Sequence, residues 1–198
     1  LSQEWTWDGG AGPADRRWSN ALNWQRDTAH PGGGDRLRFP DDIDSARPEN
    51  DLAPGTAIGS IAFGDAGGTN AYRLVGNGLT LQGDIRNQSS IDQTVDLALE
   101  LDSTHTFEGE SGALLLDGTL DGGGVVTIAG AGDVSLGAPA GGIEPLESVT
   151  AEAGGGLRLG GGAVRTSGEQ TYHRAIDLAA DCRLEGNRIL LRAGVDAA

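Results

Sequence analysis

The 198-residue chain contains no lysine and only one cysteine, Cys182. A single cysteine permits no internal disulfide, which excludes a small fold held together by disulfide bridges. No apolar run is long enough to cross a bilayer, so insertion into a membrane is not expected. All 14 basic residues are arginine, against 29 acidic residues, and the net charge is −15. A surface of this charge repels nucleic acid and anionic membranes, so neither is an expected partner.

Helical periodicity is also missing, because no segment of useful length places apolar residues 3.6 positions apart. Proline is scarce at 7 residues, while glycine is abundant at 34 residues but follows no Gly-x-y repeat. Collagen and a disordered Pro/Gly linker are therefore excluded. Short stretches with period-two alternation, such as 79–85 and 113–120, lie between turns rich in Gly, Asp, Asn and Ser. This pattern predicts an all-β fold.

A short motif recurs four times, reading Leu-x-Leu-x-Gly followed by a small or branched apolar residue. Its copies begin at Leu79, Leu114, Leu157 and Ile189, and the last copy has Ala193 in place of glycine. Repeats on this scale indicate one supersecondary unit stacked on copies of itself. We therefore expect a parallel β-solenoid, or β-helix, whose core column is formed by the paired aliphatic residues of the four motifs.

The first 50 residues differ from the rest because they contain all four tryptophans, namely Trp5, Trp7, Trp18 and Trp24. The end of a stacked sheet exposes unpaired strand edges, and large aromatic side chains provide the area needed to cover them. We predict that 1–50 form a Trp-rich structural cap on a solenoid at 51–198, the two making one continuous unit. The alternative is that exposed tryptophan rings stack on sugars as a glycan-binding face.

No comparable cap follows at the other end, where the chain stops just after a repeat. We expect that the natural chain continues beyond Ala198 or that another chain docks there. The first residue, Leu1, is not methionine, which is consistent with a leader that has been removed.

The N-terminal block follows the pattern W-x-W-D-G-G, then W-S-x-A-x-N-W, then P-G-x-G-D-x-L-x-F-P. The residues that carry this pattern are Trp5, Trp7, Asp8, Gly9, Gly10, Trp18, Ser19, Asn23, Trp24, Pro31, Gly34, Asp35, Leu37, Phe39 and Pro40. Two further stretches, Y-x-L-x-G-N-G-L-T-L-Q-G from Tyr72 and Q-T-Y-x-x-x-I-D-L-A-A-D-C-R-L-E-G from Gln170, continue the resemblance.

Together these residues resemble the passenger regions of exported bacterial proteins with autotransporter-associated β-strand repeats. They are also similar to the stacked coils of filamentous-haemagglutinin-type adhesins. The resemblance covers nearly the whole chain and implies a right-handed β-solenoid at the bacterial cell surface. Cys182 departs from the pattern, because it stands where the family usually has a hydroxyl residue.

Catalysis would require a nucleophile beside one of the three histidines, His30, His105 or His173. Alignment of the two longest repeats places His105 level with Cys182 on one inward face. This placement predicts that the cysteine is a small, inert side chain that fills space in the core. Acidic residues are so numerous that no carboxylate pair marks a glycosidase. The sequence therefore predicts a protein that is not an enzyme. The alternative is a carbohydrate-binding or carbohydrate-cleaving β-helix protein.

Calcium is the one cofactor that the sequence suggests. The stretches 32–39 and 130–137 resemble halves of the calcium-binding nonapeptide Gly-Gly-x-Gly-x-Asp-x-apolar-x, with the Gly-to-Asp spacing short by one. The alternative is that Asp35 and Asp133 are turn residues that cap a strand. The carboxylates expected as calcium ligands are Asp35, Asp41, Asp42 and Asp44.

These patterns favour an extracellular structural or adhesive module on the bacterial surface. The expected partners are copies of the chain itself or neighbouring solenoid coils, with host or matrix glycans as further candidates. Association of copies would build a surface filament or stalk, and the acidic flanks would keep such filaments apart.

Overall fold

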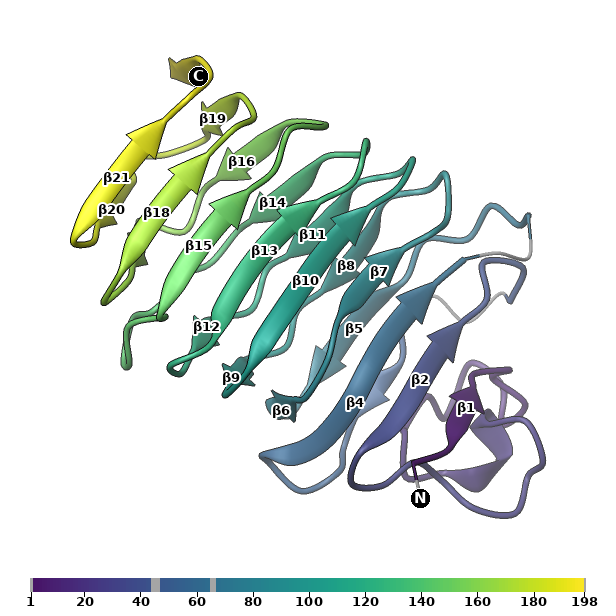
Figure 1. Cartoon of the computed structure of the whole chain (residues 1–198). Coiled ribbons are helices and arrows are strands. Elements are labelled where there is room, and N and C mark those ends of the chain that lie inside the picture. The colour runs from purple at the N-terminus through teal and green to yellow at the C-terminus, as the bar shows by residue number, and fades with distance from the viewer. Residues whose placement is uncertain (1, 44–46, 65–66, 198) are drawn as a thin grey trace.

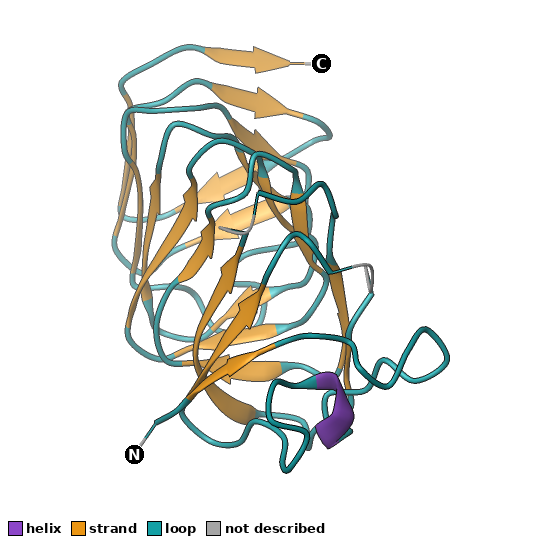
Figure 2. Ribbon diagram, turned by 90° about the vertical axis from the view of Figure 1, so that its right-hand side faces the viewer, coloured by secondary structure: helices purple, strands orange, loops and turns teal. Residues whose placement is uncertain are grey.

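The computed structural model describes residues 2–43, 47–64 and 67–197 and has the predicted fold class, a right-handed parallel β-solenoid (Figure 1). The helical content of these residues is one 3-10 turn, Ala21–Asn23 (η1), which lies at the N-terminal end of the stack (Figure 2). No described helix is long and apolar enough to span a bilayer.

Each coil of the chain passes over three faces, and every face is a ladder of parallel strands. The first face, here called the long face, begins with β1 (Glu4–Thr6). It continues through β2 (Asp35–Phe39), β4 (Thr56–Phe63), β7 (Ile85–Asn87), β10 (Thr104–Gly109), β13 (Val125–Ala129), β15 (Ser148–Ala151), β18 (Glu169–Tyr172) and β21 (Arg188–Leu191).

The second face contains β3 (Glu49–Asn50), β5 (Arg73–Gly76), β8 (Gln93–Val95), β11 (Leu114–Leu116), β14 (Val134–Leu136), β16 (Leu157–Leu159), β19 (Ile176–Leu178) and β22 (Val195–Ala197). The third face contains β6 (Leu79–Leu81), β9 (Leu99–Leu101), β12 (Leu120–Asp121), β17 (Ala163–Arg165) and β20 (Arg183–Glu185). Single bridges through Ala140 join β12 to β17. β4 is long enough to pair with β6 through its first half and with β7 through its second half.

The chain advances by 19 to 24 residues per coil on the long face. Matched inward positions there are Leu37, Ile61, Ile85, Phe107, Ile128, Ala151, Tyr172 and Leu191. Side chains alternate across a strand, so each strand offers two or three residues to the interior. Stacking joins these small contributions into one apolar core.

The predicted single core column is wrong, although most of its members are buried. Leu79 lies on the third face, Leu114 and Leu157 lie on the second face, and Ile189 lies on the long face. The motif spacings of 35 and 32 residues are not whole numbers of coils and therefore lead to different faces, whereas the spacing of 43 residues is two coils and returns to the second face. The first three pairs point inward and are at most 2% exposed, whereas Ile189 and Leu191, in the last coil, are 37% and 49% exposed.

The predicted boundary at residue 50 falls inside a continuous ladder. β1 pairs with β2 in parallel, and β2 pairs with β4 in the same way. The Trp-rich segment and the coils therefore share one sheet. The hydrogen bonds of this sheet begin at β1, inside the Trp-rich segment and well before the change in composition near residue 50.

Polar side chains connect successive coils where the chain turns. Asp84 and Asp92 accept hydrogen bonds from the amides of Thr106 and Ala113, each one coil further along, at 2.8 Å. Arg174 spans two coils, because its Nε donates to the carbonyl of Glu152 (2.7 Å) and its Nη2 to that of Gly130 (3.1 Å). Burial lowers the pKa of Arg174, and the nearby carboxylates of Asp133 and Glu152 oppose this effect.

Candidate functional site

Three of the four tryptophans, Trp7, Trp18 and Trp24, form a buried aromatic cluster at the N-terminal end, and Trp5 is buried in the same core. Trp7 and Trp24 meet edge to face with ring centroids 5.2 Å apart, and Trp18 meets Trp24 at 6.1 Å. Phe39 lies at the centre, within 6.0 Å of these three rings and 5.6 Å from both Phe63 and Tyr72. Trp5 is 7% exposed and the other three tryptophans are fully buried. Their ring faces are therefore not available to stack on a sugar.

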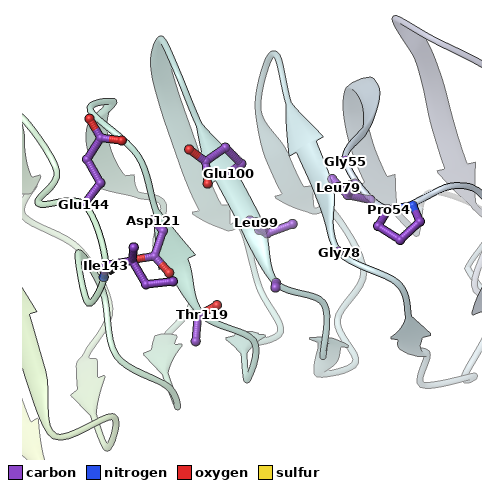
Figure 3. Close-up of a pocket in the computed structure, with 11 residues that line it drawn as sticks. Pro54, Gly55, Gly78, Leu79, Leu99, Glu100, Thr119, Asp121, Ile143 and Glu144 are labelled. Atoms are coloured by element: carbon purple, nitrogen blue, oxygen red, sulfur yellow. Dashed lines mark hydrogen bonds between the residues drawn. The ribbon is translucent and has the colours of Figure 1, made fainter.

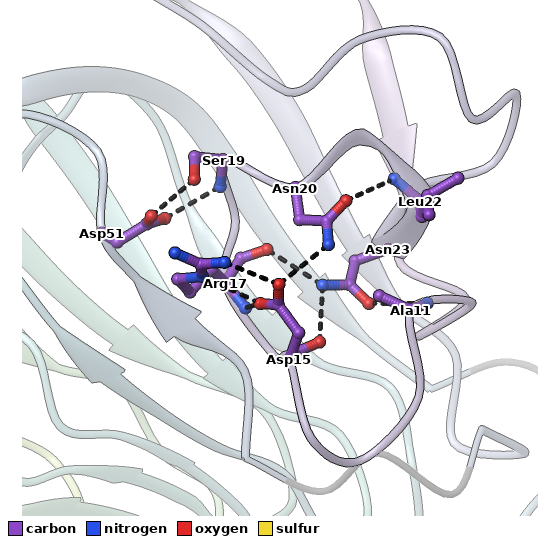
Figure 4. A network of polar contacts seen from close by, with 8 residues as sticks. All are labelled: Ala11, Asp15, Arg17, Ser19, Asn20, Leu22, Asn23 and Asp51. Atoms are coloured by element: carbon purple, nitrogen blue, oxygen red, sulfur yellow. Dashed lines mark hydrogen bonds and ion pairs between the residues drawn. The ribbon is translucent and has the colours of Figure 1, made fainter.

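A polar network holds the loops around this cluster (Figure 4). The carboxylate of Asp15 accepts from Arg17 Nη2 (2.7 Å) and from Asn20 Nδ2 (3.0 Å). The hydrogen bonds from Arg17 hold the pKa of Asp15 well below its usual range. Asn23 donates to the carbonyls of Asp15 and Arg17, and Ser19 donates to Asp51, just after β3. The sequence analysis did not find this network, although the closely spaced Asp, Asn and Ser residues are typical of such turns.

Asp35, a predicted calcium ligand, already accepts three hydrogen bonds from the protein. Oδ1 accepts from the amide of Gln3 (2.8 Å), and Oδ2 accepts from Trp5 Nε1 (2.8 Å) and from the amide of Gly32 (3.0 Å). Burial raises the pKa of Asp35, but these donors outweigh it, and the net pKa lies below its ordinary value. The geometry is that of a turn carboxylate that holds the N-terminal strand.

We expect Asp35→Asn to lower the free energy of unfolding at pH 7 by about 1–3 kcal/mol, because the charge-assisted hydrogen bonds weaken. A depressed pKa contributes stability above the unfolded value of about 4, and that contribution is lost as pH falls through the folded pKa. The difference between wild type and variant in urea unfolding should therefore shrink below about pH 4. The exposed Asp102→Asn is the matched control, and equal effects of the two variants would contradict this account.

The other calcium candidates do not join Asp35. Asp41 is buried and accepts from the amide of Gly68 (2.9 Å) and from Ser89 Oγ (2.7 Å). Asp42 is exposed, and Asp44 lies outside the described residues. Within the described ranges, no three His, Cys, Asp or Glu side chains gather as a metal site would require. Asp133, in the second nonapeptide-like stretch, is a turn residue whose carboxylate accepts a hydrogen bond from the amide of Gly156 (2.6 Å).

The alignment of His105 with Cys182 is wrong. His105 lies in β10 on the long face, whereas Cys182 precedes β20 on the third face, because the repeats used for the alignment differ in their phase around the coil. Cys182 is half-buried against the core, and burial raises the pKa of its thiol. A thiol held in its protonated form is a poor nucleophile.

A serine that the sequence analysis did not consider lies beside His105. Ser103 Oγ is 3.3 Å from His105 Nε2, and the amide of Ser103 is 3.4 Å from the same atom. His105 Nδ1 lies 2.8 Å from the carbonyl of Gly83, one coil below, which assigns the proton to Nδ1. Ser103 lies just before β10, two residues from His105, and this short spacing is the sequence signal for the pair. Since the imidazole is fully buried and bonded on both sides, it joins two coils.

A groove of about 330 Å³ crosses the corner between the second and third faces (Figure 3). Small residues from four successive coils line it, namely Gly55, Gly78, Ala98 and Thr119. Three carboxylates, those of Glu100, Asp121 and Glu144, also line it, and no arginine does. Ile143 stands at one end and is 91% exposed, with its amide donating to Asp121 Oδ1 (2.7 Å).

The C-terminal coil leaves the core partly uncovered. β20, β21 and β22 are the outermost described strands of their three faces, so each has one unpaired edge. Ile189, Leu191 and Val195, in the last described coil, are 37–49% exposed, whereas their counterparts in earlier coils are buried.

Comparison of the chain with protein families, curated proteins and solved structures finds no match.

Proposed function

We propose that the chain is a non-catalytic structural or adhesive module of the bacterial cell surface. It acts as a rod, through its shape and through contacts at its end and flanks. The observation that carries this proposal is the continuous stack of parallel strands over three faces, whose N-terminal end is covered by a buried aromatic cluster. Such a stack is a regular rod, and its coils contact only their neighbours along the axis.

The flanks suit the same role. Their ladders present exposed ion pairs, such as Arg73 with Asp96 (2.8 Å) and Asp117 (3.1 Å), on a chain of net charge −15. A rod with acidic flanks repels parallel neighbours, which keeps such rods apart. The resemblance of the tryptophan pattern to exported passenger regions supports placing this rod outside the cell.

Surface location is tested on intact cells that produce the protein. We expect an antibody raised against the chain to label unlysed cells and external protease to remove the label, while a cytoplasmic marker stays intact. Labelling that requires lysis would contradict an extracellular role.

A second candidate function is carbohydrate binding, which the groove lined by Glu100, Asp121 and Glu144 favours. Solenoid grooves accommodate extended chains, and carboxylates accept hydrogen bonds from sugar hydroxyls. Calorimetric titration with polysaccharides separates the two functions: saturable binding that Glu100→Gln weakens supports the second. Tryptophan fluorescence is a poor reporter here because the four rings are buried.

A further inference from the structure

We propose that the groove at the corner of the second and third faces binds a linear aliphatic polyamine. Such a ligand is a chain of ammonium groups separated by short methylene segments. It lies along the rod axis, with its ammonium groups beside the carboxylates of Glu100, Asp121 and Glu144, which line the groove. This inference does not depend on the rod-like role proposed above, and it assigns to the groove a ligand other than a polysaccharide.

Two carboxylates in this groove are stacked directly on one another. Asp121 of β12 is the register partner of Glu100 of β9, one coil earlier. Like charges that face each other on neighbouring strands repel and destabilise the pair. None of the described residues lining the groove is basic, and neither carboxylate forms an ion pair within the described part of the chain. The repulsion is therefore not offset by the protein itself.

Elsewhere the protein offsets the same arrangement with arginine. Asp96 and Asp117 directly follow the paired strands β8 and β11, so they are also stacked in successive coils. Arg73 lies 2.8 Å from Asp96 and 3.1 Å from Asp117 and bridges the two. The pair of Glu100 and Asp121 has the same stacking without the cation. A neutral polysaccharide can donate hydrogen bonds to these carboxylates, but it brings no charge to offset their repulsion.

Asp121 is the carboxylate that most clearly lacks a partner. It is only 8% exposed, and its Oδ1 accepts a hydrogen bond from the amide of Ile143 (2.7 Å). Its Oδ2 accepts no hydrogen bond from the described residues, although the side chain lines the groove. A carboxylate buried to this extent is costly unless its charge is paired. A cation in the groove provides that pairing.

The three carboxylates follow one another along the rod. Glu100 and Asp121 lie in successive coils, and Glu144 lies in the loop after Ala140, which pairs with Leu120 from the coil below (Figure 3). Among the described residues, no three acidic, histidine or cysteine side chains gather as a metal site requires. The arrangement therefore fits a linear polycation better than a single metal ion.

The distance between coils indicates the kind of polycation. Successive coils lie about 4.8 Å apart, the usual spacing of hydrogen-bonded strands. Ammonium groups separated by three or four methylenes lie roughly 5–6 Å apart at standard bond lengths. On one side of an extended peptide, side chains recur only about every 6.7 Å. A polyamine therefore matches one charge to each coil, whereas an extended basic peptide does not.

The remainder of the lining suits methylene groups. Gly78, Ala98 and Thr119, from three successive coils, are small residues along the groove, and Pro54 lies at one end. Ile143 stands at the other end and is 91% exposed. A ligand that lies along this lining covers apolar surface with its methylenes while its charged groups contact the carboxylates.

Calorimetric titration of the whole chain with spermidine at low ionic strength tests the proposal. We expect one saturable site per chain, with an affinity that falls as salt is added because the charges are partly exposed. Glu100→Gln and Asp121→Asn should each weaken binding roughly fivefold or more, because each removes one charge contact. The asparagine retains an oxygen that can accept from the amide of Ile143.

Two controls separate this site from general attraction to an acidic protein. Glu147→Gln makes the same charge change three residues beyond Glu144, at an exposed position that does not line the groove, and should leave the affinity unchanged. Bis(hexamethylene)triamine carries three amines roughly 9 Å apart, which exceeds the distance between coils. It should bind several-fold more weakly than spermidine. Circular dichroism confirms that each variant is folded.

The other outcomes overturn the proposal in different ways. Equal losses in Glu100→Gln and Glu147→Gln, or equal affinities for the two triamines, would show only diffuse attraction of cations to an acidic surface. Tighter binding of trilysine than of spermidine would assign the groove to a basic peptide. Binding of a neutral polysaccharide but not of spermidine would leave carbohydrate binding as the function of the groove. No binding at all would overturn the site, while labelling of intact cells still tests surface location separately.

Discussion

Replacing Phe39 with alanine is expected to lower the free energy of unfolding by about 3–5 kcal/mol. Phe39 is fully buried and contacts five other aromatic rings, so its removal leaves a cavity that stiff neighbours cannot fill. For a chain of this size, the loss corresponds to a fall in Tm of roughly 10 °C. Urea unfolding followed by tryptophan fluorescence measures it directly, because Trp7, Trp18 and Trp24 all contact Phe39.

Two controls accompany this variant. Phe39→Leu retains most of the volume and should cost less than half as much. Leu22→Ala removes an aliphatic side chain from the same region, but Leu22 is 50% exposed and its loss should change stability by less than about 1 kcal/mol. A Phe39→Ala variant as stable as Leu22→Ala would show that the cluster does not hold the N-terminal end.

Replacing Gly118 with alanine is expected to lower the free energy of unfolding by about 3 kcal/mol. Gly118 lies at the corner between β11 and β12, where an added Cβ would overlap the backbone of Leu97 in the coil below. Backbone atoms in a hydrogen-bonded stack cannot move aside as a flexible side chain can. Relief of the overlap must therefore separate two coils and weaken the hydrogen bonds on both adjoining faces.

The matched control is Gly33→Ala. A Cβ at Gly33 would meet nothing within 4 Å, and its backbone is not in the left-handed region. This variant should be neutral, or more stable by about 0.4–1 kcal/mol because the unfolded chain loses freedom. Thermal unfolding by circular dichroism compares the two variants, and equal stabilities would contradict a tight approach of coils at Gly118.

The fold class could be predicted because alternation and glycine-rich turns are local features. The number of residues per coil could not be predicted. Stacking requires an apolar side chain at each inward position, but it does not require the same amino acid in every coil. Leu37, Ile61, Ile85 and Phe107 occupy one column with three different side chains. The copies of Leu-x-Leu-x-Gly look more alike than true neighbours do, yet none of them pairs with another, and they are spread over three faces. A search for recurring identity therefore finds the wrong period.

The sequence identified several residues of the candidate site, but it did not predict which contacts these residues make. The tryptophans were found by composition, and their burial follows from packing around Phe39, which the sequence does not reveal. The glycines before Asp35 singled this residue out in the sequence. Two of the three donors to its carboxylate, however, come from Gln3 and Trp5, about 30 positions away. The contact between Ser103 and His105 was not predicted, because the alignment of the repeats paired His105 with Cys182, which lies on a different face.

The hydrogen bonds between coils run along the rod axis, and this determines how the molecule yields to mechanical force. Tension applied between the two ends loads one coil boundary at a time, so coils detach in sequence and not together. The coil boundaries next to the aromatic cluster should resist longest, because buried rings anchor the N-terminal end. Each released coil of about 21 residues adds roughly 70 Å of extended chain. A rod built in this way should lengthen in discrete steps under load.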